Sequence, residues 1–172
     1  MTLTTHALVG AAAASLFPAY PYAAFAAGFV SHLAIDALPH WDYGQHLHSI
    51  EKDPARRMHT DMKFGKHFLR DLSVIGADAL LGFVLTFVVA WLLQIPPEVA
   101  LVGAGAGVLP DLLQFVYYKI RTTPFEPALH YLQKLHVWLQ KGIEHPEWGW
   151  QKGLGLQALL VVFLLLLVSF LV

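Results

Sequence analysis

The amino-acid sequence predicts an all-α, multi-pass membrane protein with about five helices plus an amphipathic surface helix, forming a single domain over residues 1–172. Only 13% of the residues are charged, about half the roughly 25% of an ordinary soluble domain. Three segments stay apolar over the roughly 20 residues that a helix needs to cross a bilayer. No segment has the alternating pattern of a strand. These observations disfavour a soluble globular protein.

Five apolar segments account for the expected membrane helices. The two N-terminal segments are shorter, rich in Ala and Gly, and separated by the turn at 18–21, where Pro18 stops the first helix. Small residues let helices approach closely, so these two segments predict a tight helical hairpin. The last segment carries no charge, its residues 159–168 are almost purely Leu, Val and Phe, and it is typical of a lipid-facing anchor. The five expected helices cover residues 4–17, 22–38, 72–93, 97–118 and 153–172.

Two polar regions separate these helices. The first is a loop at 39–70 that is rich in His, Lys and Arg. The second contains an amphipathic stretch at 125–143, where Leu129, Leu132 and Leu139 recur at helical spacing among Gln and Lys residues. Such a helix is expected to lie along the membrane surface.

The basic residues indicate an orientation. If the five helices alternate, the N-terminus and both polar regions lie on one side, and all 11 Lys and Arg residues belong to that side. The connections on the opposite side, 18–21 and 95–98, contain none. The positive-inside rule then predicts a plasma-membrane (bacterial inner-membrane) protein with a cytoplasmic N-terminus and an external C-terminus.

Composition also excludes several kinds of site. A net charge of −1 argues against a nucleic-acid binder, which needs a strong basic field. The absence of Cys excludes disulfides and thiolate metal sites. Any transition metal must therefore bind His and carboxylate side chains, and the chain has 10 His residues.

Ionisable residues inside membrane helices are costly and indicate a functional site. His32 and Asp36 are four residues apart, so they project from one face of their helix. At about 1.5 Å per residue, His32 lies roughly 9 Å from the helix end at 38. Asp78 and Asp111 lie at similar depths, roughly 9 and 10 Å from the same side. We therefore expect these groups to meet beneath one membrane face.

Candidate metal ligands extend beyond this pair, because Pro39 should end the helix and place His40 and Asp42 just beyond it. The set suits Zn best, with Mn or Fe as alternatives. A catalytic metal would acidify a water into a nucleophile, and Asp78 or Asp42 would act as base or additional ligand. The alternative for His32 and Asp36 is a structural role as a buried hydrogen-bonded pair that fixes helix packing. The expected ligands are His6, His32, Asp36, His40 and Asp111.

The remaining histidines are weaker candidates. His46, His48, His59 and His67 lie in the basic loop, where solvent or headgroup contact is the simpler expectation. His130 and His136 belong to the amphipathic stretch. Of these two, His136 is the better candidate, since it falls near the apolar stripe and can roof the site.

The motif His32-x-x-x-Asp36-x-x-Pro39-His40, with an early His6 and with Asp111 after Gly-Val-Leu-Pro, resembles a family of integral-membrane proteins described as metal-dependent hydrolases. The resemblance runs from the first helix through the fourth and implies a metal site and hydrolysis without naming a substrate. The ligand spacing is also distantly similar to zinc-dependent phospholipase C and the S1/P1 nucleases.

The leading hypothesis is therefore a membrane-embedded metal-dependent hydrolase with a cytoplasm-facing His/Asp site, acting on a lipid or phosphoester. The alternative is a transporter that moves protons or metal ions through the buried Asp/His cluster. A third reading is a scaffold with a structural metal. The expected partners are membrane lipids and a membrane-associated substrate, and no nucleic acid.

Overall fold

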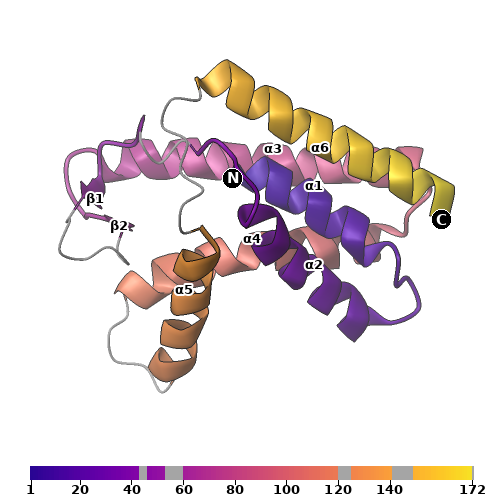
Figure 1. Cartoon of the computed structure of the whole chain (residues 1–172), viewed down its shortest axis with the longest axis horizontal. Coiled ribbons are helices and arrows are strands. Elements are labelled where there is room, and N and C mark those ends of the chain that lie inside the picture. Colours follow the sequence, from indigo (N-terminus) through magenta and orange to yellow (C-terminus); the bar gives the residue numbers. More distant parts are fainter. Residues whose placement is uncertain (43–45, 53–59, 120–124, 141–148, 172) are drawn as a thin grey trace.

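The computed structural model describes residues 1–42, 46–52, 60–119, 125–140 and 149–171 (Figure 1). The fold is all-α, as predicted. Within these residues the chain forms six helices: α1 (Leu3–Ala14), α2 (Pro21–Asp36), α3 (Phe68–Leu92), α4 (Pro97–Lys119), α5 (Glu126–Gln140) and α6 (Trp150–Leu171). Three of them, α3, α4 and α6, are long and apolar enough to cross a membrane.

The ends of the first two helices have local causes. The Thr2 side chain accepts a hydrogen bond from the Thr5 amide and caps α1. The helix ends at Ala14, three residues earlier than predicted, where the Ser15 hydroxyl donates to the Ala12 carbonyl. Pro21 is the first residue of α2, a position where its missing N–H costs nothing.

A small antiparallel hairpin within the polar loop was not predicted. Strands β1 (Ile50–Lys52) and β2 (Thr60–Met62) pair with Ile50 opposite Met62. The buried Asp71 carboxylate in the first turn of α3 accepts hydrogen bonds from the amides of His48 and Ser49, at 2.7 and 2.6 Å. The loop is thus fastened to α3, which starts at Phe68 rather than 72. Three residues per strand are too few for an alternating pattern to be recognised.

Helix α1 is the most enclosed helix, and it packs against α2, α3, α4 and α6. Its contact with α4 depends on small residues. A Cβ atom at Gly103 would overlap Ala14 and the backbone of Gly10, and one at Gly107 would overlap the His6 carbonyl. The Gly-rich run of α4 is therefore a helix-packing surface.

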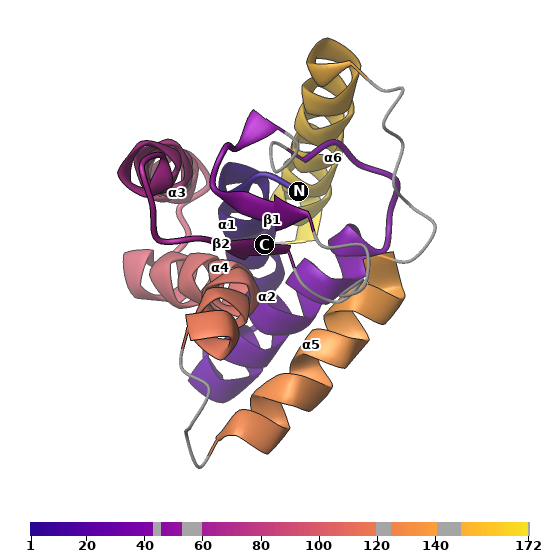
Figure 2. The same ribbon diagram turned by 90° about the vertical axis from the view of Figure 1, so that its left-hand side faces the viewer.

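The helix directions bring the polar regions together. In Figure 1 the N-terminus, the ends of α2 and α4, and the starts of α3 and α6 lie at one end of the bundle, and α5 crosses the direction of the other helices. Figure 2 looks toward that end and shows the hairpin and α5 there, with α5 beside α2. The described parts of both polar regions thus lie at the same end of the bundle as the N-terminus.

Helix α5 packs with a mixed face inward, on which half-buried Leu132 and Leu139 lie beside polar side chains. Gln133 and His136 are buried, whereas Tyr131 and Trp138 are 70% and 68% exposed. The exposed aromatic side chains are of the kind found at membrane interfaces. The amphipathic helix was predicted, and its last expected residues, 141–143, lie outside the described part of the chain.

Candidate metal centre

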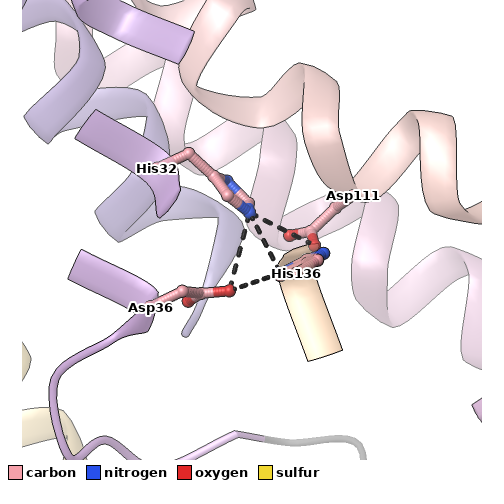
Figure 3. A group of neighbouring side chains, drawn as sticks. All are labelled: His32, Asp36, Asp111 and His136. Carbon is pink, nitrogen blue, oxygen red and sulfur yellow. Dashed lines mark hydrogen bonds and ion pairs between the residues drawn. The ribbon is translucent and has the colours of Figure 1, made fainter. Parts of the chain in front are cut away.

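Four side chains from three helices converge at the end of the bundle. His32 and Asp36 come from α2, Asp111 from α4 and His136 from α5 (Figure 3). One potential ligand atom from each residue lies within 4.8 Å of those of the other three. His32, Asp36 and His136 are buried, and the Asp111 side chain is 30% exposed. The cluster is therefore closed toward the bundle and partly open beside Asp111.

Local structure explains how these side chains meet. His32 and Asp36 are one helical turn apart in the last part of α2, so both face α4 and α5. Asp111 follows Pro110 inside α4. Helix α5 adds His136 and, one turn later, Gln140, whose side-chain amide donates to Asp36 Oδ2 at 2.7 Å. Three helices thus contribute at a single point, as expected for His32, Asp36 and Asp111.

The distances suit a transition metal. His32 Nε2 lies 3.4 Å from His136 Nε2, 3.5 Å from Asp36 Oδ2 and 3.7 Å from Asp111 Oδ1. A tetrahedral ion with ligand bonds of about 2.0–2.1 Å separates its ligand atoms by about 3.3 Å. The distance from His136 Nε2 to Asp36 Oδ2 is shorter, 2.7 Å, because the two share a hydrogen bond. Two imidazoles and two carboxylates thus fit a divalent ion in type, number and spacing.

The tautomer of His32 is that of a metal ligand. Its Nδ1 lies 2.7 Å from the carbonyl oxygen of Gly107. A carbonyl only accepts, so Nδ1 carries the proton, and the lone pair of neutral His32 is on Nε2, facing the cluster. Metal-binding histidines are commonly oriented by this kind of hydrogen bond to the other ring nitrogen.

Electrostatics favour a cation among these groups. Burial opposes the charged form of His136, but the hydrogen bond to Asp36 and the charges of Asp111 and Asp36 raise the pKa of His136 above its ordinary value. The buried α-ammonium of Met1 also lies 3.0 Å from Asp36 Oδ1. Buried carboxylates need such positive partners, and a proton on His136 and the Met1 ammonium supply them here.

Two further predicted ligands lie beside the group of four. His6 Nε2 is 3.2 Å from Asp36 Oδ1, and the His6 ring stacks on His32 with centroids 3.8 Å apart. His40 Nε2 is 3.8 Å from Asp36 Oδ1, and its Nδ1 donates to the Leu38 carbonyl. Burial and the charge of the Met1 ammonium lower the pKa of His40. The three predicted histidine ligands, His6, His32 and His40, thus each place a ring nitrogen within 3.8 Å of an Asp36 oxygen.

The two carboxylates expected to act as base or additional ligand are not members of the group of four. Asp78 is on α3, where its oxygens accept hydrogen bonds from the amides of Leu3 and Thr4 and from the Thr4 hydroxyl. These amides belong to the start of α1, so Asp78 holds that helix in place. Asp42 is exposed two residues beyond His40.

His136 completes the group of four, although the sequence ranked it behind the five expected ligands. The sequence feature that pointed to His136 was its place near the apolar stripe of an amphipathic helix, from which its side chain can cover the site. His130, on the same helix, lies outside the group and bonds to the Tyr117 hydroxyl at 2.7 Å. Of the loop histidines, His46, His48 and His67 are exposed, and His59 lies outside the described residues.

No family model matches the chain, and no curated protein or solved structure matches it at a significant level. The comparisons thus identify no family for the resemblance seen in the motif. The candidate site therefore rests on the geometry of its own side chains. What is established is a helical protein with three candidate membrane spans and a buried His/Asp group that could hold a metal ion.

Proposed function

We propose that the chain is a membrane-embedded, metal-dependent hydrolase whose centre is formed by His32, Asp36, Asp111 and His136. One observation carries this proposal: these four side chains converge from three helices, with His32 held in the tautomer of a metal ligand by Gly107. A hydrogen-bonded pair that served helix packing alone would not need two further ionisable groups at the same point.

The donor set suits Zn best, with Mn or Fe as alternatives. When bound, such an ion supplies a water of lowered pKa as nucleophile. Asp111 is the most exposed member of the four, so the nucleophilic water would bind on its side as a fifth ligand. Asp42 is our candidate base, because it is exposed next to His40. Asp78 is assigned a positioning role, because its hydrogen bonds are made to the start of α1.

A lipid substrate is supported by an apolar cleft beside the site. The cleft has a volume of about 260 Å³, lies between the end of α2 and α6, and is lined by Met1, Leu38, Pro39, Leu156, Gln157 and Leu160. Met1 lines this cleft, and its ammonium donates a hydrogen bond to Asp36 Oδ1. An acyl chain in the cleft would bring its ester or phosphoester toward the carboxylates.

Hydrolysis is favoured over transport by the packing behind the site. A transported ion would need a path along α4 from Asp111 toward Pro97. The approach of Gly103 to Gly10 and Ala14 fills the space between α1 and α4 on that path with backbone and methyl groups. We further propose that the site faces the cytoplasm of a bacterial inner membrane, because the Lys and Arg residues that the structure describes belong to this end of the bundle.

Reconstitution into phospholipid nanodiscs tests this function. We expect the metal-loaded chain to hydrolyse the surrounding lipid, EDTA to abolish turnover and added Zn(II) or Mn(II) to restore it. Mass spectrometry separates fatty-acid release from cleavage at the phosphate. His130→Ala is the matched control for His136→Ala, since both residues lie on α5. Metal or proton flux in sealed vesicles without lipid turnover would instead favour the transporter.

A further inference from the structure

The two oxygens of the Asp36 carboxylate face two different groups of side chains. Oδ2 is 2.7 Å from His136 Nε2 and 3.5 Å from His32 Nε2, within the group of four. Oδ1 is 3.2 Å from His6 Nε2 and 3.8 Å from His40 Nε2. One carboxylate thus stands between two pairs of imidazoles.

Asp111 stands between the same two groups. Its Oδ1 is 3.7 Å from His32 Nε2, and its Oδ2 is 4.0 Å from His6 Nε2. The oxygens of Asp36 and Asp111 that face away from His32 therefore both face His6. His6 Nε2, His40 Nε2 and these two oxygens are the same atom types as in the first group, and both ring nitrogens lie within 3.8 Å of Asp36 Oδ1.

His6 is the strongest sign that this second set has a ligand. Its side chain is fully buried, and neither Nδ1 nor Nε2 has a hydrogen-bond partner. Buried polar atoms without partners are rare in folded proteins and call for an explanation. The stacking of His6 on His32, at an interplanar angle of 21°, disfavours a positive charge on both rings. His6 Nε2 is turned toward Asp36 Oδ1 and Asp111 Oδ2, so a cation between them would give this buried nitrogen a partner.

His40 is prepared for the same role by its backbone. Its Nδ1 donates to the Leu38 carbonyl at 2.7 Å, so neutral His40 has its lone pair on Nε2. His32 is oriented in the same way by Gly107, and each presents Nε2 to a different oxygen of Asp36. A backbone carbonyl thus orients one histidine on each side of the Asp36 carboxylate.

This second position already attracts positive charge. The Met1 ammonium is 3.0 Å from Asp36 Oδ1, on the side of His6 and His40. We infer that His6, His40, Asp36 Oδ1 and Asp111 Oδ2 form a second divalent-metal subsite, bridged to the first by both carboxylates, with the Met1 ammonium as its competitor. The inference rests on the proposed function and specifies its centre as a two-metal site. Such sites place two ions about 3.5–4 Å apart and stabilise the attacking and leaving oxygens of a phosphoester together.

Metal counting on the untagged full chain in detergent tests this inference. After chelation and reloading with Zn(II), elemental analysis is expected to give two ions per wild-type chain. His40→Ala and His6→Ala are each expected to bind one ion, and His130→Ala to keep two. With Mn(II), the wild type should give the electron paramagnetic resonance spectrum of exchange-coupled ions, and His40→Ala that of an isolated ion.

The outcomes separate this inference from the proposed function. One ion per wild-type chain would overturn the second subsite and leave the group of four intact, whereas no bound ion would overturn both. Two ions retained in both His6→Ala and His40→Ala would also overturn the subsite. His40 lies beyond the end of α2, so His40→Ala decides the question if His6→Ala does not fold.

Discussion

The imidazole of His136 on α5 lies 2.7 Å from the carboxylate of Asp36 at the end of α2, although 100 residues separate them in the sequence. This contact attaches an amphipathic helix to the end of the bundle. Gln140 strengthens it with a second hydrogen bond to the same oxygen of Asp36. The contacts that hold α5 against the bundle therefore also complete the candidate metal site.

The role of His136 as a ligand predicts a selective loss of metal affinity. We expect His136→Ala to weaken Zn(II) binding by more than the roughly 10–100-fold that loss of an outer-shell partner costs. His130→Ala removes a histidine from the same helix and should leave affinity unchanged, because His130 bonds to Tyr117 instead. Competition with a chromophoric chelator measures both variants. Equal affinities would show that His136 is not a ligand.

The raised pKa of His136 predicts opposite pH trends with and without metal. In the metal-free protein its proton binds more tightly in the folded than in the unfolded state. That stabilisation is fully present below the unfolded value of about 6.5 and is lost as pH rises through the raised folded value. The groups facing His136 are Asp36, Asp111, His32 and the Met1 ammonium.

Metal binding displaces this proton, so the apparent affinity for Zn(II) should increase over the same pH range. Thermal unfolding in detergent, followed by circular dichroism from pH about 6 to 9, should show metal-free protein becoming less stable and metal stabilisation becoming larger. In His136→Gln the loss of metal-free stability should become smaller, with the contribution of the Met1 ammonium remaining. Wild type and His136→Gln with identical pH profiles would exclude His136 as the titrating group.

The close approach of α1 and α4 predicts an asymmetry between neighbouring glycines. Gly103→Ala places a methyl group against Ala14 and the backbone of Gly10, whereas the position at Gly105 has no atom within 4 Å. We expect Gly103→Ala to cost at least about 1–3 kcal/mol. Gly105→Ala should be neutral or stabilise by about 0.5–1 kcal/mol. Unfolding midpoints in detergent compare them, and equal destabilisation by both would contradict the packing.

The proposed orientation predicts labelling from opposite faces. The chain has no Cys, so single cysteines can be introduced at two exposed positions, Lys66 in the polar loop and Ala19 in the α1–α2 turn. Lys66→Cys should react with a membrane-impermeant maleimide only in inside-out vesicles, and Ala19→Cys only in right-side-out vesicles. Labelling of both from one face would contradict the alternation of the helices.

Much of the candidate site was predictable because helical geometry is regular. The spacing of His32 and Asp36 fixed their common face, and the rise per residue placed Asp111 at the matching depth. Asp78 was also placed near that depth, but depth alone carries no information on which way a side chain points. In the structure Asp78 faces the first amides of α1.

The parts that were not predicted depend on specific side-chain hydrogen bonds, most of them long-range. The stop of α1 at Ala14 follows from the Ser15 hydroxyl, which competes with the next backbone bond. The inward orientation of Gln140 on α5 depends on its hydrogen bond to Asp36, which lies far away in the sequence. Gln157 was read as part of a plain anchor, yet it accepts from the Thr2 amide and donates to the Trp41 carbonyl. No local sequence pattern predicts the partners of Gln157.

Binding of a transition metal by the buried His/Asp group is measured directly by elemental analysis of the purified, untagged chain. Wild type reloaded with Zn(II) is predicted to hold at least one ion per chain after desalting, and Asp36→Asn to lose bound metal. Glu98→Gln, an exposed change at the opposite end of α4, should match wild type. A folded wild type that binds no metal, or an Asp36→Asn variant that binds as much as wild type, would contradict the account.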